Sequence, residues 1–316
     1  MMGKKLDKEY EASLKSIETE NYVDRLFYRP LGFQIAKMLR NTPITPNMVT
    51  IISIFFGVAA GPLFYYNNIV YCICGIVCLI IANILDCVDG QLARLTGIKS
   101  KIGRILDGLA GDLWFLSIYV CIAMRLNNEF NTWMFFIPAS LAGLSHIIQA
   151  NITDYYKTLH LYFLNKEKGY EFQRLSEVRK QHKEMKPGIE KMLFFFYIGY
   201  TSLQEALTPK QQLFFKKSDE YYGDNIPDHI GKVITCKSRI VMKKYLDFLT
   251  FNGRSIILFL SVLSGYVWIY LAYEIIILNI VLIISIYKYE RIFACFFQPG
   301  NEVDAFRQPL STKSEN

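Results

Sequence analysis

The stretch NILDCVDGQLARLTGIKSKIGRILDGLAGD, residues 83–112, decides the fold of this chain. It sets four carboxylates within or beside strongly apolar segments: Asp86, Asp89, Asp107 and Asp112. A lone carboxylate inside a bilayer costs roughly 3 kcal/mol even on the lenient insertion scale, so such residues normally face a polar cavity, a partner or a metal. Four carboxylates so close together therefore predict a cation site.

The spacing of these carboxylates indicates the kind of cation. Asp86 and Asp89 are three residues apart, so on a helix their side chains differ by only about 60° in azimuth and share one face. Asp107 follows on the next apolar segment, which would bring a third carboxylate from a neighbouring helix. Oxygen ligands of this kind suit a hard cation such as Mg2+ or Mn2+.

The composition of the chain indicates a membrane protein. Of its 316 residues, 52% are apolar and 15% aromatic, which exceeds the norm for soluble domains. Mostly uncharged segments of about 17 to 25 residues are long enough to span a bilayer. Six such spans are predicted, at residues 48–66, 69–89, 105–124, 133–151, 255–272 and 273–289. The last is the shortest, and its flanking residues Glu274 and Lys288 are expected to reach the membrane interfaces.

The rest of the chain completes an all-α, polytopic membrane protein. Residues 22–40 mix apolar and basic side chains and precede the first span, so they predict an amphipathic helix in the membrane interface. About a hundred residues separate spans four and five, too many for a simple loop, and they predict a cytosolic helical insertion. The predicted organisation is a cytosolic tail with the interfacial helix (1–47), spans one to four with the Asp-rich motif (48–151), the insertion (152–253), spans five and six (254–290) and a second cytosolic tail (291–316).

The distribution of charge predicts partners and orientation. The net charge is +7, and its bases lie in loops beside the spans, so anionic lipid headgroups and nucleotide phosphates fit better than nucleic acid. The loop between spans two and three carries Arg94, Lys99, Lys101 and Arg104 with no acidic residue between them. The positive-inside rule therefore places the Asp-rich stretch, the insertion and both termini in the cytoplasm of an integral protein of the cytoplasmic (inner) membrane.

The carboxylates and the small residues between them form a longer pattern. It reads Asp86-x2-Asp89-Gly90-x2-Ala93-Arg94-x8-Gly103-x3-Asp107. This pattern resembles the signature of the CDP-alcohol phosphotransferase (CDP-alcohol phosphatidyltransferase) family. The Thr-Pro-Asn entry to the first span is similar to the same family.

The resemblance implies a role for each residue of the pattern. The Asp residues would bind a two-metal site of Mg2+ or Mn2+, while the small residues and the arginine would accommodate the CDP portion of a CDP-linked donor. The implied metal ligands are Asp86, Asp89, Asp107 and Asp112, and the implied CDP-binding residues are Gly90, Ala93, Arg94 and Gly103. Asp112 would also help deprotonate the attacking hydroxyl of an alcohol acceptor. The resemblance further implies a homodimer among membrane lipids.

One position departs from the family signature, which continues with an Asp four residues after Asp107. Position 111 is Gly111, and the carboxylate follows at Asp112. On a regular helix Asp112 would point about 140° away from Asp107. Three interpretations remain open: a one-residue bulge, which Gly108 and Gly111 would make easier; another proton acceptor, such as His146 or the substrate itself; or nucleotide binding without activity.

Polar residues of the later spans have two interpretations each. His146, Gln149 and Thr153 fall on one face of span four, where they serve either hydrogen bonds within the bundle or recognition of the acceptor. Arg254 opens span five and is either an interfacial anchor or a ligand for phosphate.

The expected function is metal-dependent transfer of a phosphatidyl group from CDP-diacylglycerol to a small polar alcohol, with release of CMP, in phospholipid biosynthesis. One alternative is an aminoalcohol phosphotransferase, which moves the headgroup of a CDP-aminoalcohol to a lipid alcohol. Another is a nucleotide-binding protein without activity or a membrane transporter, since polar residues inside spans often line ion paths. The crowding of carboxylates at one end of spans two and three favours a site open to a soluble nucleotide.

Overall fold

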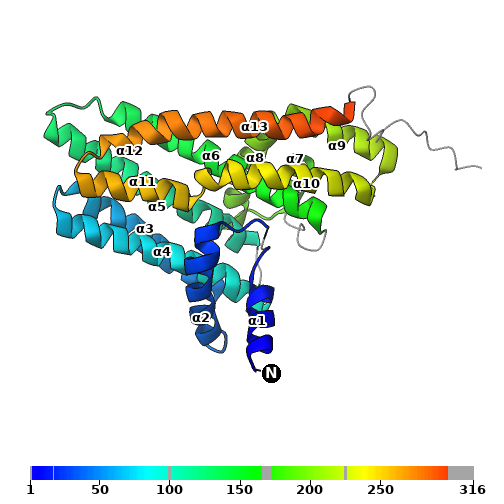
Figure 1. The fold of residues 1–316 in the computed structure, drawn as a ribbon, viewed down its shortest axis with the longest axis horizontal. Helices are drawn as coiled ribbons and strands as arrows, with labels where there is room; N and C mark the ends of the chain where they lie inside the picture. The colour runs from blue at the N-terminus through cyan, green and yellow to red at the C-terminus, as the bar shows by residue number, and fades with distance from the viewer. Residues whose placement is uncertain (1, 17, 99–100, 166–171, 224–225, 298–316) are drawn as a thin grey trace, which may run out of the picture. The chain divides into compact units, whose positions relative to one another are not determined.

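The computed structural model describes residues 2–16, 18–98, 101–165, 172–223 and 226–297. All the regular secondary structure of this part of the chain is helical (Figure 1), which confirms the predicted all-α class. The predicted tail beyond residue 297 lies outside the described residues.

The chain forms two compact units. The first comprises residues 1–150 and 250–279, and the second residues 151–249 and 280–316. Helices of the first unit are α1 (Met2–Ser13), η1 (Asp24–Tyr28), α2 (Arg29–Leu39), α3 (Pro46–Tyr65), α4 (Ile69–Thr96), α5 (Lys101–Glu129), α11 (Phe251–Ser264), α12 (Trp268–Ala272) and η3 (Tyr273–Ile277). Helices of the second are α7 (Leu175–Glu184), α8 (Ile189–Ala206), α9 (Pro209–Tyr222), α10 (Asp228–Lys244), η2 (Leu246–Leu249) and η4 (Cys295–Phe297). Two helices contribute residues to both units, α6 (Phe136–Leu164) and α13 (Leu278–Ala294).

Within the described residues, four helical segments are long and apolar enough to cross a membrane. They are Pro46–Tyr65, Ile69–Thr96, Gly103–Glu129 and Trp268–Phe297. α6 is long but carries polar side chains such as His146 and Gln149, and α11 has only 14 residues. The structure therefore supports an integral membrane protein, whereas the predicted count of six spans is not confirmed.

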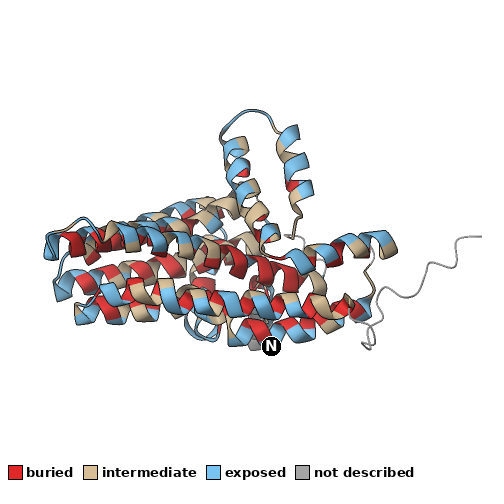
Figure 2. Ribbon diagram, turned by 90° about the horizontal axis from the view of Figure 1, so that it is seen from above, coloured by how far each residue is buried: buried red, intermediate tan, exposed pale blue. Residues whose placement is uncertain are grey.

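The membrane-capable segments bury only part of their surface. Between 28% and 39% of their most apolar windows is buried inside the structure, and large apolar side chains such as Phe55 and Leu116 are exposed. Figure 2 shows buried and exposed positions alternating along single helices. Extensive outward-facing apolar surface is typical of helices that contact lipid.

The boundary predicted between spans five and six is wrong. α11 ends at Ser264, and Gly265 follows in the left-handed conformation (φ 82°) that closes a helix without a side-chain clash. The segment Trp268–Phe297 then continues through the predicted boundary. Glu274, which was expected to reach an interface, is fully buried and ion-paired with Arg254. The charge of Glu274 therefore marks an interior contact and not the end of a span.

Capping residues fix the start of α3 and both ends of α4. Thr45 accepts a hydrogen bond from the backbone N–H of Met48 and starts α3, and Pro46 occupies its first turn, where no N–H is required. Asn68 caps the start of α4 with its side chain. Gly97, with φ 74°, ends α4 in the left-handed conformation.

Two glycines let α3 pack closely against α5. Gly57 and Gly61 are four residues apart on the buried face of α3. A Cβ added at Gly57 would meet the Trp114 side chain at 2.1 Å, and one added at Gly61 would meet the Ser117 backbone at 2.7 Å. Small residues at this spacing are how membrane helices bring their backbones together.

The leader before α3 exposes apolar side chains. Tyr22, Leu26 and Met38, in or beside η1 and α2, are 69%, 69% and 76% exposed. Tyr28 is buried. Its burial, and to a lesser extent the nearby Asp24 carboxylate, raises the pKa of Tyr28 to about 12. An exposed apolar face next to basic residues is typical of an interfacial helix, and the placement of this segment in the membrane interface stays a prediction.

Replacing Gly61 with alanine is expected to destabilise the protein by about 1–3 kcal/mol, because the added methyl meets backbone atoms of α5 that cannot rotate away. Thermal unfolding of the purified protein in detergent measures this effect. Gly143→Ala is the matched control, since a Cβ at Gly143 meets Tyr119 at 3.6 Å, an ordinary van der Waals distance. Equal unfolding midpoints for the two variants would contradict the close packing of α3 against α5.

Candidate metal and nucleotide site

Three carboxylates from α4 and α5 converge in the first unit. Asp86 and Asp89 lie three residues apart on α4, and Asp107 lies in the second turn of α5. One ligand oxygen from each carboxylate lies within 4.8 Å of the other two. Asp89 is buried, Asp86 half-buried and Asp107 exposed. Three oxygens at this spacing fit a hard divalent cation, which would also offset the repulsion between the carboxylates.

Thr50 on α3 orients the most buried of these carboxylates. Its Oγ1 lies 2.6 Å from Asp89 Oδ2, to which the hydroxyl donates a hydrogen bond. Thr50 is itself buried and follows the Thr45 cap by five residues. The sequence pattern of the Asp-rich stretch does not single out Thr50; the only signal was a hydroxyl near the start of an apolar span.

The residues predicted to accommodate the CDP portion lie near the ends of α4 and α5. Gly90, Ala93 and Arg94 occupy the last two turns of α4, and Gly103 the first turn of α5. Gly90 and Ala93 follow Asp86 at helical spacing and so continue its face. The guanidinium of Arg94 folds over Gly90, since a Cβ there would meet Arg94 Nη2 at 3.1 Å. A small residue at position 90 therefore accommodates the arginine, and the nucleotide-binding role of these residues stays a prediction.

The leader helix α1 contacts the same end of α4. Arg94 donates a hydrogen bond from Nε to the Ser13 carbonyl, and Gln91 donates one from Nε2 to the Ser13 hydroxyl at 3.1 Å. Ser13 and Gln91 are fully buried. A phosphate that binds Arg94 must therefore share its donors with the leader carbonyl or displace it.

Asp112 does not join the three-carboxylate group. The described helix α5 is regular between Asp107 and Asp112, so the proposed bulge is not formed. Asp112 Oδ1 lies 3.7 Å from Nε2 of His146 on α6. This geometry favours the role of a base for Asp112 over the metal-ligand role predicted from the sequence, and Mn2+ binding tests the difference.

His146 belongs to a buried polar network in the first unit. Arg254 Nη1 lies 2.6 Å from His146 Nδ1 and 2.5 Å from Glu274 Oε1. The Tyr119 hydroxyl lies 3.3 Å from His146 Nδ1 and 3.2 Å from the Tyr270 hydroxyl. All five side chains are at most 4% exposed. Arg254 is therefore not an interfacial anchor, because its charge is buried and paired with Glu274.

Gln149, one turn beyond His146, is bound within the same unit. Its Nε2 donates hydrogen bonds to the Glu274 carbonyl at 3.2 Å and to Asn279 Oδ1 at 3.0 Å. These contacts favour the bundle interpretation for Gln149 over recognition of an acceptor.

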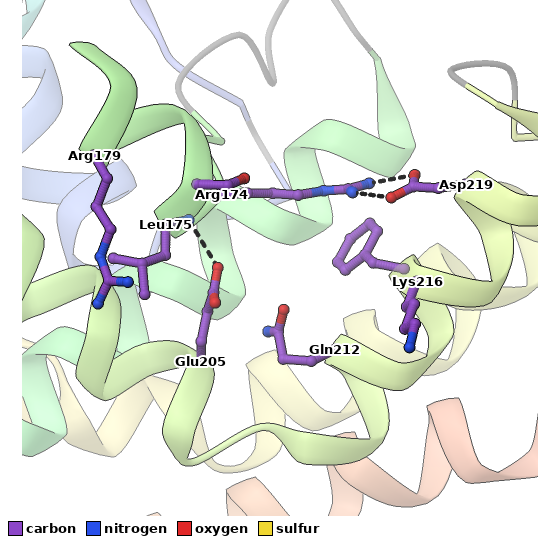
Figure 3. Close-up of a pocket in the computed structure, with 9 residues that line it drawn as sticks. Arg174, Leu175, Arg179, Glu205, Gln212, Lys216 and Asp219 are labelled. Carbon is purple, nitrogen blue, oxygen red and sulfur yellow. Dashed lines mark hydrogen bonds and ion pairs between the residues drawn. The ribbon is translucent and has the colours of Figure 1, made fainter. Parts of the chain in front are cut away.

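A separate pocket of about 360 Å³ lies within the second unit (Figure 3). Its lining residues, from α7, α8, α9 and the residue before α7, are Arg174, Leu175, Ser176, Arg179, Glu205, Gln212, Phe215, Lys216 and Asp219. Arg174 binds Asp219 through both Nη atoms, and this hydrogen bonding raises the pKa of Arg174. Glu205 accepts the backbone N–H of Leu175 at 2.8 Å. Two of the polar contacts in this pocket are therefore made between its own lining residues, and the lining contains none of the predicted site residues.

The converging carboxylates lie in a stretch that matches a known family. Residues 43–167 match the family described as CDP-alcohol phosphatidyltransferase. This part of the chain is therefore similar to the CDP-alcohol phosphatidyltransferase family. The resemblance of the Asp-rich pattern is thereby confirmed, and all the predicted site residues fall inside this CDP-alcohol phosphatidyltransferase domain.

A curated relative is similar to part of the chain. The archaetidylinositol phosphate synthase of Pyrococcus horikoshii is 40% identical to it over 91 residues, which are 29% of the chain and 47% of the synthase. The chain thus spans about half the length of this relative.

The affinity for Mn2+ tests which carboxylates of the CDP-alcohol phosphatidyltransferase domain are metal ligands. Asp89→Asn is expected to weaken Mn2+ binding about 10-fold or more, because it removes a buried carboxylate that Thr50 orients. Asp112→Asn is expected to leave the Kd unchanged, since Asp112 faces His146. Electron paramagnetic resonance of free Mn2+ in titrations of the detergent-purified protein measures both. An equal loss of Mn2+ affinity in the two variants would show instead that Asp112 contributes to metal binding.

Proposed function

We propose that the protein is a metal-dependent CDP-alcohol phosphatidyltransferase of phospholipid biosynthesis. It transfers a phosphatidyl group from CDP-diacylglycerol to a small polar alcohol and releases CMP. The observation that supports this most is the convergence of Asp86, Asp89 and Asp107 inside the family domain. A cation held by these carboxylates would neutralise the negative charge of the diphosphate in a CDP-linked donor.

The reaction displaces CMP at the phosphorus that carries the lipid. The acceptor hydroxyl oxygen forms a new bond to this phosphorus, the bond to the oxygen bridging the two phosphates breaks, and CMP leaves with that electron pair. The hydroxyl proton passes to a base. Two negatively charged phosphates resist attack, so neutralisation and in-line positioning of the reacting oxygens carry most of the catalysis.

The residues of the domain have distinct tasks in this proposal. Asp86, Asp89 and Asp107 would hold Mg2+ or Mn2+, which when bound would supply charge neutralisation of the diphosphate and alignment of the attacking and leaving oxygens. Thr50 keeps Asp89 in its ligand orientation. Arg94 supplies a charge-assisted donor to a phosphate at the end of α4.

Small residues near the end of α4 and the start of α5 leave room for the nucleotide. Gly90 and Ala93 leave the last turns of α4 without large side chains, and Gly103 does the same at the start of α5. A diphosphate and a flat base can approach a helix closely only where side chains are small. Asp112 takes the proton of the acceptor hydroxyl.

The direction of transfer is the least constrained part of the proposal. An aminoalcohol phosphotransferase would use the same Asp pattern with a soluble CDP-aminoalcohol donor. The similarity to an archaetidylinositol phosphate synthase favours a lipid-linked donor and a small polar acceptor, because that protein's name describes a lipid with a polar headgroup. We therefore propose phosphatidyl transfer.

The test is an assay of the purified protein in lipid nanodiscs with Mg2+ or Mn2+. Radiolabelled CDP-diacylglycerol or CDP-ethanolamine is offered with a panel of alcohols that includes inositol, inositol phosphate, glycerol phosphate, serine and diacylglycerol. We expect CMP release and a labelled phospholipid only with CDP-diacylglycerol and one small polar alcohol. A product from CDP-ethanolamine and diacylglycerol would establish the aminoalcohol alternative. No CMP release with any donor would refute the enzyme and leave nucleotide binding or transport.

A further inference from the structure

Asp112 has a specific neighbour, and the proposal developed from it rests on the proposed function. Asp112 lies on α5, about 7.5 Å further along the helix axis than Asp107. His146 on α6 presents Nε2 to Asp112 Oδ1 at 3.7 Å. Asp112 is partly buried, with 20% of its side chain exposed, while the His146 side chain is 5% exposed. The carboxylate thus has one side against the protein interior and a remaining exposed fraction for substrate.

The network around His146 determines which ring nitrogen carries the proton. Arg254 Nη1 lies 2.6 Å from Nδ1, and a guanidinium only donates hydrogen bonds. Nδ1 must therefore be the acceptor, and in a neutral imidazole the proton then sits on Nε2. An imidazolium would place a second N–H against the guanidinium, so the network disfavours it. The nitrogen that carries this proton, Nε2, is the one that lies 3.7 Å from Asp112 Oδ1.

Burial and packing hold the ring in this orientation. The imidazole packs against Phe115 with ring centroids 4.5 Å apart, and the Tyr119 hydroxyl lies 3.3 Å from Nδ1. Arg254 is fixed in turn by Glu274, which lies in the π-helical turn η3. π-Helical turns occur frequently at functional sites. Side chains from α5 and α11 thus contact the His146 ring, and Glu274 of η3 pairs with the arginine of α11.

We propose that His146 is a positioning residue for Asp112 in the transfer reaction. Its Nε2–H directs the carboxylate through Oδ1 and leaves Oδ2 to accept the proton of the acceptor hydroxyl. The 3.7 Å separation closes to a hydrogen bond with a movement of under about 1 Å, as catalytic hydrogen bonds tighten when substrate binds. The acceptor oxygen forms its bond to the lipid-bearing phosphorus as this proton reaches Oδ2, and CMP leaves.

A purely structural role and a positioning role for His146 require different polar atoms at this position. Arg254 requires only an acceptor where Nδ1 lies, whereas Asp112 requires a donor where Nε2 lies. Asparagine carries its polar atoms near the Nδ1 position and does not reach Asp112. Glutamine extends further, so its amide N–H reaches the Nε2 position while its oxygen accepts from Arg254. The two amides therefore separate packing from positioning.

The first measurement uses the wild-type protein and needs no activity. The side chains of histidine are labelled with 15N, and the signal of His146 is assigned from its loss in His146→Gln. Ring-nitrogen chemical shifts in nanodiscs are expected to show a protonated Nε2 and an unprotonated Nδ1. A protonated Nδ1 would overturn the proposal whether or not the protein transfers phosphatidyl groups.

The second measurement is the steady-state kinetics of His146 variants with the product-forming substrate pair. His146→Asn is expected to lower kcat about 10- to 100-fold with an unchanged KM for the CDP donor, and His146→Gln to restore most of kcat. In the Asp112→Asn background, His146→Asn is expected to have no further effect. His160→Asn is the matched control, because His160 is a buried histidine of α6 that contacts Ser238 at 2.7 Å; its kcat is expected to equal that of wild type.

Three kinetic results would contradict the positioning role. They are equal activity of the Asn and Gln variants, an effect of His146→Asn that persists in full without the Asp112 carboxylate, and an equal loss in His160→Asn. Circular dichroism and Mn2+ binding identify any variant that fails to fold, and the nitrogen shifts of the wild-type protein then decide. A wild-type protein that releases no CMP would refute the proposed function and not the assignment of the tautomer.

Discussion

The structure depends on the rule that charge among apolar helices must be partnered. Desolvation makes an isolated buried charge costly, so a charged side chain persists in such a place only with an opposite charge, hydrogen bonds or a metal. The first unit applies this rule in two ways. Arg254 and Glu274 neutralise each other inside the helical bundle, while the carboxylates of Asp86, Asp89 and Asp107 repel each other and are best stabilised by a cation. The Arg254–Glu274 pair links two helical segments of the unit, and the three carboxylates form the proposed cation site.

Close packing of α3 against α5 positions residues of both clusters. Gly57 and Gly61 admit α5 against α3, and α3 in turn delivers Thr50 to Asp89. The same helix α5 carries Asp107 toward the metal group and Asp112 toward His146. One regular helix therefore carries both a proposed metal ligand and the proposed base, since five residues of helix rotate the side chain by about 140°.

Local spacing was sufficient to predict part of this arrangement. The interval between Asp86 and Asp89 places them on one helical face, and the signature through Asp107 indicated both the family and the convergence that the structure contains. Helical class and membrane character followed from long apolar segments. In these cases the determining contacts lie within a few turns of helix or follow from composition.

Long-range contacts account for what the sequence patterns missed. In the sequence alone, the charge of Glu274 indicates the end of a span, because its buried partner Arg254 is distant in the chain. The boundary between the last two spans was therefore misplaced. The expected bulge near Asp112 presumed that the carboxylate must reach the metals, whereas His146 gives it another neighbour. Thr50 carries no distinctive local signal. The spacing of Gly57 and Gly61 is readable in the sequence, but only the structure identifies α5 as the helix they admit.

The most direct test of the account is the anomalous X-ray scattering of Mn2+ in crystals grown with Mn2+ and CDP-diacylglycerol. The account predicts Mn2+ bound to carboxylate oxygens of Asp86, Asp89 and Asp107, with diphosphate oxygens of the donor completing its coordination. Mn2+ bound elsewhere, or a donor diphosphate that does not contact Mn2+ at these three residues, would contradict it.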